Sequence, residues 1–426
     1  MKVLMFGWEF PPFVSGGLGT ACFGLTRGLV NRGMEVTFVV PKLPEKADSH
    51  VRLVGANRIE ITAVEKLISE VQDNLKVLEI DSALRPYLDF KEYAQWVRRI
   101  KEQTGRTTTV TVSTEFTGAY GPDLMSEIVR YALIGHMLGK SESFDVIHAH
   151  DWLTILAGIE AKRASGKPLI VHMHALEFDR SGDNVNQAVY DLERRGMEAA
   201  DLVIAVSYYT RDLIVKRYGI PESKIRVVHN AVTKEKTIER LHIKKNLDEK
   251  IVLFLGRITF QKGPEYFVEA ARRVIERVPG VRFVMAGTGD MFRRMVEHMA
   301  ALRLGKYFHF TGFLKGTEVE RMFAMSDLYV MPSVSEPFGI TPLEAILYDV
   351  PVIVSKQSGV AEVLDHAIKV DFWDTEKLAD KIIAILSQPA LARQIAAANS
   401  RQIEGIKWEI AADKVIAAYR ELAGDR

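Results

Sequence analysis

Short apolar runs alternate along this chain with longer amphipathic segments. In the first half, near-continuous runs rich in Val and Ile fall at residues 2–8, 35–40, 146–149, 169–174, 202–206 and 225–229. Such runs are typical of strands that are buried on both faces of a sheet. Between them lie helical stretches at residues 20–32, 152–164, 185–199 and 208–218. Strands that alternate with helices predict a parallel sheet.

The second half repeats this pattern. Strand-like runs fall at residues 251–255, 282–286, 307–310, 328–331 and 352–354, with helical stretches at 264–278, 291–304, 318–324 and 341–347. A charged stretch with little apolar content, residues 231–250, separates the halves and predicts a linker. Two doubly wound α/β domains that face each other across a cleft fit this arrangement. A (β/α)8 barrel fits less well, because the strand candidates exceed eight and the charged break falls mid-chain.

The expected domains are residues 1–232 and 245–407. An amphipathic helix at about 408–426 ends the chain and is expected to pack back on the first domain. Residues 58–120 are less regular and richer in charge; they are either an insertion that contacts an acceptor or additional surface helices. Ligands of doubly wound folds sit at the carboxyl ends of strands, which here would line the cleft.

The composition narrows the class of protein. Among 426 residues, 56 basic side chains nearly balance 55 acidic ones, which disfavours a nucleic-acid binder that neutralises many phosphates. The single cysteine, Cys22, excludes an internal disulfide and fits a reducing compartment. The first apolar run is too short for a signal peptide, and no run approaches the ~18 residues of a membrane helix. We therefore expect a soluble, cytoplasmic protein.

A glycine-rich loop, Ser15-Gly16-Gly17-Leu18-Gly19, follows the first strand and opens a helix. Glycines let backbone N–H groups approach an anion closely, and the helix N-terminus adds partial positive charge. The loop is a candidate phosphate cradle, although packing or a dinucleotide would also explain it. A nicotinamide cofactor is disfavoured, because the spacing is not G-x-G-x-x-G and no acidic residue ends the second strand.

Two cations mark the start of the second half. Arg257 ends its first strand and Lys262 opens the next helix, and Gly256 and Gly263 flank the pair. A planar guanidinium and a point-charge ammonium at this position can hold one diphosphate, although two solvated loop cations are the alternative. The chain contains no Asp-x-Asp. These cations and helix termini would then have to neutralise the charge that develops on a leaving diphosphate.

The segment Glu336-Pro-Phe-Gly-Ile-Thr-Pro-Leu-Glu344 is the most specific signal in the chain. Glu336 lies in a loop after a strand, and Glu344 lies within a helix whose first turn holds Pro342. Carboxylates accept from vicinal hydroxyls, so Glu336 can hold a transferred sugar and Glu344 a ribose. A helix-capping glutamate plus a surface glutamate is the alternative. Backbone N–H groups just before the helix are further donors, at Phe338, Gly339, Ile340 and Thr341.

These motifs together resemble the retaining GT-B glycosyltransferases of family 4 and the neighbouring glycogen and starch synthases of family 5. The resemblance spans nearly the whole chain. It rests on Gly16-Gly17-Leu18-Gly19, His148-Ala149-His150-Asp151-Trp152, Val206-Ser207, Val228-His229-Asn230, Gly256-Arg257 with Lys262-Gly263, Ala286-Gly287-Thr288-Gly289, Pro332-Ser333 and the E-x7-E pair. It implies a GT-B fold of two Rossmann-like domains.

The resemblance also implies roles for single residues. Arg257 and Lys262 would hold the donor diphosphate, Gly17 would contact it from the other domain, and Glu344 would bind ribose. Glu336 would contact the donor sugar and assist the transition state. His174 resembles the histidine that reaches the sugar near its 6-hydroxyl, and His172 is the competing choice. Asp151 resembles an acid that lines the cleft, and capping the next helix is its alternative role. The loops at Gly287-Thr288 and Gly312-Phe313 are candidates for contact with the base.

Two departures from the glycogen synthases favour family 4. Val14 stands where those enzymes usually carry Lys, and Glu344 supplies a second glutamate that they usually lack. The expected activity is metal-independent transfer of a hexosyl unit, glucosyl above all, from ADP-glucose or UDP-glucose to a sugar or α-1,4-glucan, with no cofactor. A disaccharide synthase or phosphorylase, or a non-catalytic binding protein, is the alternative. The base, the acceptor and a homo-oligomeric state are left open.

Overall fold

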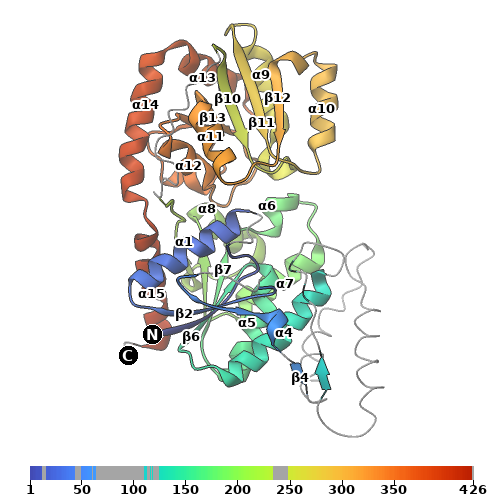
Figure 1. Cartoon of the computed structure of the whole chain (residues 1–426), viewed down its shortest axis with the longest axis vertical. Helices are drawn as coiled ribbons and strands as arrows, with labels where there is room; N and C mark the ends of the chain where they lie inside the picture. Colours follow the sequence, from blue (N-terminus) through green and yellow to red (C-terminus); the bar gives the residue numbers. More distant parts are fainter. Residues whose placement is uncertain are drawn as a thin grey trace.

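The computed structural model describes residues 1–11, 16–43, 49–59, 61–63, 110–112, 116, 118, 124–233 and 248–424, and the structural statements below concern these residues. Most of the expected 58–120 insertion and the centre of the expected linker, 234–247, lie outside them. The described residues form two α/β halves, one above the other in Figure 1.

The first half is built on a seven-stranded sheet whose paired strands are all parallel. In spatial order its strands are β3 (Arg52–Gly55), β2 (Glu35–Val40), β1 (Lys2–Phe6), β6 (Val146–His150), β7 (Leu169–Met173), β8 (Leu202–Ala205) and β9 (Ile225–Val227). The order reverses direction between β1 and β6. In open parallel sheets, this switch point is where ligands bind, beyond the carboxyl ends of the strands.

Helices cover both faces of this sheet because its strands are apolar on both sides. The helices of the first half are α1 (Gly17–Asn31), α4 (Leu124–Ser141), α5 (Trp152–Ser165), α6 (Glu177–Ser181), α7 (Gln187–Ala199) and α8 (Tyr208–Leu213). One buried cluster joins the sheet to α4 and α5, and a second joins it to α1. A separate antiparallel pair consists of β4 (Ile61–Ala63) and β5 (Val110–Val112).

The second half has a six-stranded parallel sheet with the same kind of reversal. Its strand order is β12 (Phe308–Gly312), β11 (Val281–Ala286), β10 (Lys250–Leu255), β13 (Leu328–Met331), β14 (Val352–Ser355) and β15 (Ile368–Val370). Its helices are α9 (Pro264–Val274), α10 (Phe292–Ala301), α11 (Thr317–Met325), α12 (Thr341–Leu347), α13 (Thr375–Ser387) and α14 (Pro389–Gln402). Its switch point lies between β10 and β13.

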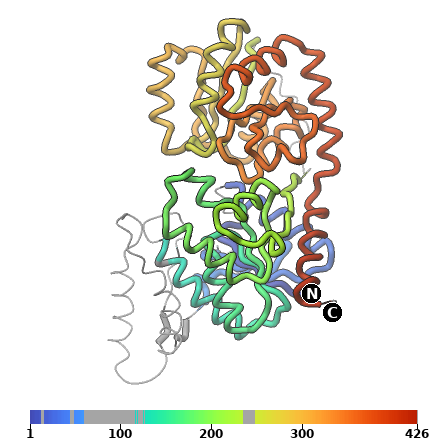
Figure 2. Tube along the Cα trace, turned by 180° about the vertical axis from the view of Figure 1, so that it is seen from behind, coloured from blue at the N-terminus to red at the C-terminus, as the bar shows by residue number. Residues whose placement is uncertain are grey.

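The last helix, α15 (Trp408–Ala423), returns to the first half and packs against α1. Figures 1 and 2 both show α14 beside the second half and α15 beside the first. Two glycines of α1 permit the contact: a Cβ at Gly24 would lie 2.1 Å from the Trp408 ring, and one at Gly28 would lie 2.7 Å from the Trp408 carbonyl oxygen. Within the described part of the chain, no helix is long and apolar enough to cross a membrane.

The two-domain α/β prediction is confirmed, with differences in detail. The helix predicted at 208–218 ends as α8 at Leu213, and residues Ile214–Tyr218 form a π-helical turn. The edge strands β3 and β15 and the helices α13 and α14 were not predicted. The two edge strands are short and contain Arg52 and Lys369, so they lack the continuous apolarity of central strands.

Candidate active site

The switch point of the second half brings Lys262 and Glu336 together. Lys262 lies in the connection from β10 to α9, and Glu336 lies in the connection from β13 to α12; β10 and β13 are adjacent strands. The Lys262 Nζ donates to Glu336 Oε2 at 2.5 Å, and Ser333 Oγ donates to the same oxygen at 3.0 Å. The Glu336 side chain is only 7% exposed, so this carboxylate is a buried anion with a cation and a hydroxyl beside it.

The connection that carries Lys262 is shaped by a glycine. Gly263 has φ of 62° and precedes Pro264, which begins α9. A Cβ at Gly263 would lie 2.3 Å from the carbonyl oxygen of Pro332, so only glycine lets the two connections approach this closely. Arg257, in the same connection, is exposed, and no described acidic residue pairs with it. The two predicted phosphate ligands therefore differ: Lys262 is bound to a carboxylate and Arg257 faces solvent.

Three further glycines bring strand ends together beside this site. The Gly256 N–H donates to the Ala286 carbonyl at 3.0 Å, and the Gly287 N–H donates to that of Gly312 at 2.8 Å. A Cβ at Gly287 would lie 1.9 Å from the Gly256 oxygen. Phe313, the residue after Gly312, is 53% exposed. The predicted base-contacting residues thus lie at the carboxyl ends of β11 and β12, on one side of β10, and include an exposed aromatic ring.

The loop from Glu336 to Ile340 is held from both halves of the molecule. The Glu336 N–H donates to the Gln357 carbonyl at 2.9 Å, and the Gly359 N–H donates to the Glu336 carbonyl at 3.0 Å. From the first half, the Ser207 hydroxyl donates to the Pro337 carbonyl at 2.6 Å. Each side therefore fixes the backbone next to the Glu336 side chain.

The next residues present backbone rather than side chains. The Phe338 side chain is buried, and Gly339 has φ of 94°, a conformation that favours glycine. No carbonyl among the described residues accepts a hydrogen bond from the N–H groups of Phe338, Gly339 or Ile340. Thr341 then begins α12 with Pro342 in its first turn. These N–H groups are donors that a ligand can use.

Glu344 differs from Glu336 in having no ion-pair or hydrogen-bond partner among the residues that the structure describes. It lies in the first turn of α12 and is half-buried. Burial raises the pKa of its carboxyl to about 7. A carboxylate in this condition gains from hydroxyl donors, because desolvation without hydrogen bonds is unfavourable.

In the first half, Gly16 precedes α1 and Gly17 begins it. A Cβ on either residue would meet no atom of the described residues within 4 Å. Ser15 and the preceding Val14 lie outside the described residues. The predicted phosphate contact from Gly17 is therefore placed at a helix N-terminus, and its role stays a prediction.

Asp151 and His174 lie beyond the carboxyl ends of β6 and β7. The Asp151 carboxylate accepts from the His174 N–H at 2.5 Å and from the Ala175 N–H at 3.3 Å. It makes no side-chain cap to α5, so the capping alternative is wrong and its side chain instead fixes the chain at His174. Asp151 has φ of 57° and ψ of 173°, a region that costs roughly 1–3 kcal/mol and recurs at functional sites.

The electrostatics of this pair favour neutral groups. Burial raises the pKa of Asp151 to about 7, against the effect of its backbone hydrogen bonds and nearby Arg180. Burial lowers the pKa of His174 to about 3, so its imidazole is uncharged at neutral pH. The His174 Nε2 lies 2.9 Å from His150 Nδ1. His172, the competing choice, pairs instead with His148 at 3.2 Å.

A hydrogen bond that joins the two halves was missed in the sequence. The Ser335 hydroxyl donates to the Asp179 carboxylate at 2.5 Å, and the Tyr209 hydroxyl lies 2.8 Å from the same Ser335 oxygen. Burial raises the pKa of Asp179 to about 6. The charged run Glu177-Phe178-Asp179-Arg180, in the connection that follows the buried strand β7, was the available signal.

A second interdomain contact centres on Glu362. Its carboxylate accepts from the N–H groups of Tyr208 and Tyr209 at 2.9 and 2.7 Å and lies 2.7 Å from His229 Nε2. Burial acts to raise the pKa of this carboxyl, but the three hydrogen bonds outweigh burial and leave it lowered. The halves are thus in direct contact on both sides of the Glu336 loop.

Comparison with known proteins identifies the family. The family described as "Glycosyl transferases group 1" matches residues 235–402, and "Glycosyltransferase Family 4" matches residues 128–236. The α-maltose-1-phosphate synthase of Mycolicibacterium smegmatis is 30% identical over 323 residues, covering 68% of this chain and 82% of that one. This chain belongs to the group 1 glycosyltransferases. It is therefore a transferase, as the motifs predicted.

Other relatives and solved structures agree. An uncharacterised glycosyltransferase from Methanocaldococcus jannaschii is 27% identical, covering 99% of this chain and 98% of that one. The glycogen synthase of Mycobacterium tuberculosis is 25% identical, covering 98% and 94%. Sucrose-phosphate synthase from Thermosynechococcus elongatus superposes with a TM-score of 0.71 at 17% identity, covering 99% and 98%. Anabaena HepE in complex with UDP-glucose gives 0.64 at 17%, covering 99% and 100%. These likenesses confirm the GT-B fold.

Proposed function

We propose that this enzyme transfers a glucosyl unit from a nucleotide-diphosphate sugar to a sugar acceptor with retention of anomeric configuration, and that the acceptor is an α-1,4-glucan. The carrying observation is the buried Lys262–Glu336 pair at the switch point, which provides a cation for a leaving phosphate next to a carboxylate for the sugar. Two likenesses support the substrates: a glycogen synthase at 25% identity, and the fold of a protein crystallised with UDP-glucose.

The C-terminal half is suited to the donor nucleotide. Lys262 and exposed Arg257 neutralise the diphosphate, while Glu344 accepts from the ribose hydroxyls. The N–H groups of Phe338, Gly339 and Ile340, which no carbonyl in the described structure accepts from, add donors. Gly17, at the start of α1, faces the phosphates from the first half.

The reaction breaks the bond between the anomeric carbon and the diphosphate oxygen. The acceptor oxygen attacks on the same face, and its proton passes to an oxygen of the departing diphosphate. Lys262 stabilises the negative charge on the leaving group, and Glu336 stabilises the positive charge that develops on the sugar. His174, neutral at working pH, hydrogen-bonds the 6-hydroxyl, while Asp151 fixes its backbone and contacts the acceptor.

The absence of Asp-x-Asp from the sequence supports a mechanism in which protein cations replace a carboxylate-held metal. The interdomain contacts of Ser335 and Glu362 close the site against water, which would otherwise hydrolyse the donor.

The test is a turnover screen of ADP-, UDP- and GDP-glucose with maltooligosaccharides, with the product anomer assigned by NMR. We expect an α-linked product from the α-linked donor, and unchanged turnover in EDTA. A β-linked product would overturn retention, and activity abolished by EDTA and restored by a divalent ion would overturn metal independence.

A sugar phosphate is the second candidate acceptor, favoured by the 30% identity to an α-maltose-1-phosphate synthase. Glucose 1-phosphate offered in place of maltooligosaccharide distinguishes it, since the disaccharide phosphate is separable by mass. Release of sugar phosphate from glucan and inorganic phosphate would instead indicate a phosphorylase. Equal donor binding without turnover by the wild type and by Lys262→Ala would indicate a non-catalytic protein.

A further inference from the structure

Four histidines and the only cysteine of the chain gather at the switch point of the first half. His148 and His150 alternate along β6, and His172 and His174 alternate along and just beyond β7, so each pair points to one face of the sheet. These strands are neighbours, with His150 paired in register with His172. That face packs against α1, which carries Cys22.

Their hydrogen bonds leave two fully buried ring nitrogens without a partner among the described residues. His148 uses both nitrogens, one 2.6 Å from the Tyr419 hydroxyl and the other 3.2 Å from His172 Nδ1. His150 Nδ1 lies 2.9 Å from His174 Nε2. The Nε2 atoms of His150 and His172 are buried without a hydrogen-bond partner in the described structure. A buried polar atom without a partner is costly and requires an explanation.

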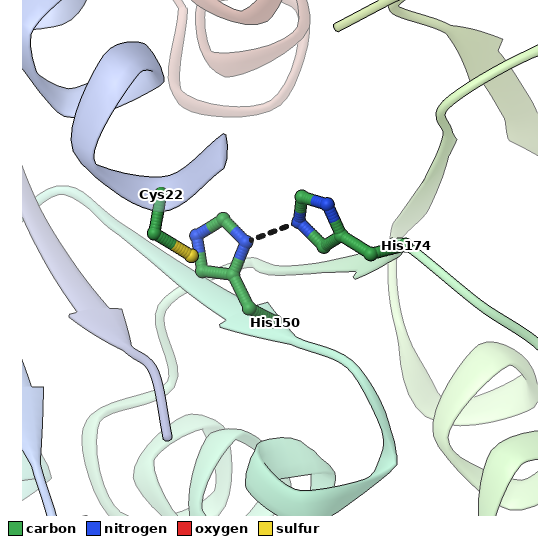
Figure 3. Close-up of side chains that lie close together, drawn as sticks. All are labelled: Cys22, His150 and His174. Atoms are coloured by element: carbon green, nitrogen blue, oxygen red, sulfur yellow. Dashed lines mark hydrogen bonds between the residues drawn. The ribbon is translucent and has the colours of Figure 1, made fainter. Parts of the chain in front are cut away.

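Figure 3 shows the His150 ring between Cys22 and His174, with its second nitrogen on the Cys22 side. One possible ligand atom from each of the three residues lies within 4.8 Å of the others. Tetrahedral coordination at Zn–N of about 2.0 Å and Zn–S of about 2.3 Å places ligand atoms roughly 3.5 Å apart. The ligand atoms must therefore move closer together. Because the two nitrogens of His150 face opposite neighbours (Figure 3), its ring must also turn so that one nitrogen faces both Cys22 and His174.

We propose that Cys22, His150 and His174 form a binding site for a thiophilic divalent ion of the Zn²⁺ class. One sulfur and two imidazole nitrogens are typical zinc ligands, and three protein ligands leave a fourth position for water or substrate. Burial keeps the pKa of both imidazoles well below its ordinary value, so each has a lone pair available. The ion replaces the His150–His174 hydrogen bond and displaces the proton of the Cys22 thiol, which is released to solvent.

A rival set, His148, His150 and His172, also brings three ligand atoms within 4.8 Å. All three of its residues are buried, and His148 is already bonded through both nitrogens. It also contains no group that becomes anionic, so a doubly charged ion there would be buried among neutral ligands. His174 is only partly buried, which gives the Cys22 set a side toward solvent.

An occupied site should inhibit sugar transfer. This consequence rests on the proposed function, because His174 is the residue assigned to the donor sugar there. The ion would withhold its imidazole from the sugar and hold it against α1. The enzyme would then be metal-independent in turnover and yet inhibited by zinc.

The decisive experiment is a cobalt(II) titration of the full-length chain without a polyhistidine tag. Because Cys22 is the only cysteine, a thiolate-to-cobalt charge-transfer band reports this residue alone. We expect one equivalent of cobalt to give this band together with the intense visible absorption of tetrahedral cobalt. Cys22→Ser should abolish the charge-transfer band and weaken binding by at least about 10-fold. His172→Gln should retain the band.

Three outcomes overturn the site: no charge-transfer band in the wild type, binding unaffected by Cys22→Ser, or tetrahedral absorption lost in His172→Gln but kept in Cys22→Ser. The last would assign the ion to the three histidines. Circular dichroism and thermal melting of each variant verify folding, and Cys22→Ala serves if the serine variant fails to fold.

Zinc inhibition is measured separately. We expect metal-free activity of Cys22→Ser within about twofold of wild type, with a zinc concentration for half-inhibition raised at least about 10-fold. A cobalt band without zinc inhibition would leave the site standing and overturn the role of His174 at the donor sugar.

Discussion

The two halves of this glycosyltransferase meet the substrate region with different electrostatics. The C-terminal half presents charged groups, the Lys262–Glu336 pair and exposed Arg257, beside Glu344, whose carboxyl has a pKa of about 7. The N-terminal half presents groups that burial keeps close to neutral, with the pKa of His174 near 3 and that of Asp151 near 7. The first face suits an anionic diphosphate, and the second suits uncharged sugar hydroxyls.

The two faces also obtain their geometry differently. In the C-terminal half, glycines such as Gly263 and Gly287 let connections approach to distances that any side chain would prevent. In the N-terminal half, a hydrogen bond fixes the backbone of a site residue: the Asp151 carboxylate accepts from the His174 N–H. In the proposed function, charge on one side binds the donor and rigid neutral groups on the other orient its sugar.

The charged face gives the largest expected effect. Lys262→Ala removes the cation beside the leaving group and leaves the Glu336 carboxylate buried without it. We expect kcat/KM to fall about 10²- to 10³-fold, as when one preorganised donor is removed from an active site. Lys356→Ala, which breaks an exposed ion pair with Asp371, is the matched control and should leave kinetics unchanged. Equal losses of kcat/KM in the two variants would contradict a specific role for Lys262 at the leaving group.

The contact that joins the faces should give the next largest effect. Ser335→Ala removes the buried hydrogen bond to Asp179, worth about 1.5–3 kcal/mol, and should move the closure equilibrium about 10- to 100-fold toward open. Small-angle scattering should show a larger radius of gyration, and the KM for donor should rise. Ser400→Ala, which removes an exposed bond to Asp349 within one half, should change neither.

Glu344 should make donor binding depend on pH. Its raised pKa of about 7 means that the charged form, which in the proposed function accepts from ribose, grows as pH rises through that value. We expect the KM for donor to fall as the pH rises from 6 to 8. Below the pKa, the fall is up to about tenfold per pH unit. In Glu344→Gln this dependence should be lost, and an unchanged profile in that variant would assign the titration to another group.

The neutral face should give the smallest response. With pKa values of about 3, His148 and His174 stay uncharged across the range in which Glu344 titrates, so their ring NMR signals should not shift between pH 8 and pH 5. The same groups charge in the unfolded chain near pH 6.5, so their contribution to stability is present above that pH and falls progressively below it. Signals of His148 or His174 that titrate near pH 6.5 would contradict a neutral N-terminal face.

Local sequence predicted the fold because its strands are apolar on both faces and its helices are amphipathic. The same alternation placed Lys262 and Glu336 in connections at the carboxyl ends of strands, which share one edge of a parallel sheet. That these two strands are neighbours was seen only in the structure. The alternation did not predict β15, a three-residue edge strand whose Ile-Lys-Val sequence carries a charge. Short, partly polar edge strands resemble loops at this level.

Contacts between distant segments were beyond this reasoning. Ser335 and Asp179 are 156 positions apart, and their pairing depends on how the two halves close. His172 and His174 both lie in the apolar run 169–174, so His172 was a competing choice for the donor-sugar contact. Their partners differ, His148 for His172 and His150 for His174, and the assignment of His174 to the sugar stays a prediction. That Arg257 and Lys262 together hold one diphosphate stays a prediction.

The return of α15 to α1 makes the second half an insertion in the first. Met1 and Leu422 pack against the same buried cluster, and both ends of the chain lie at the same side of the lower half in Figure 1. A fragment cut after residue 233 would therefore lack part of its own core and expose the surface at Gly24 and Gly28 that Trp408 covers. The first half is separable only as a splice that keeps 408–423, whereas joining the two ends in a circular permutant leaves both cores whole.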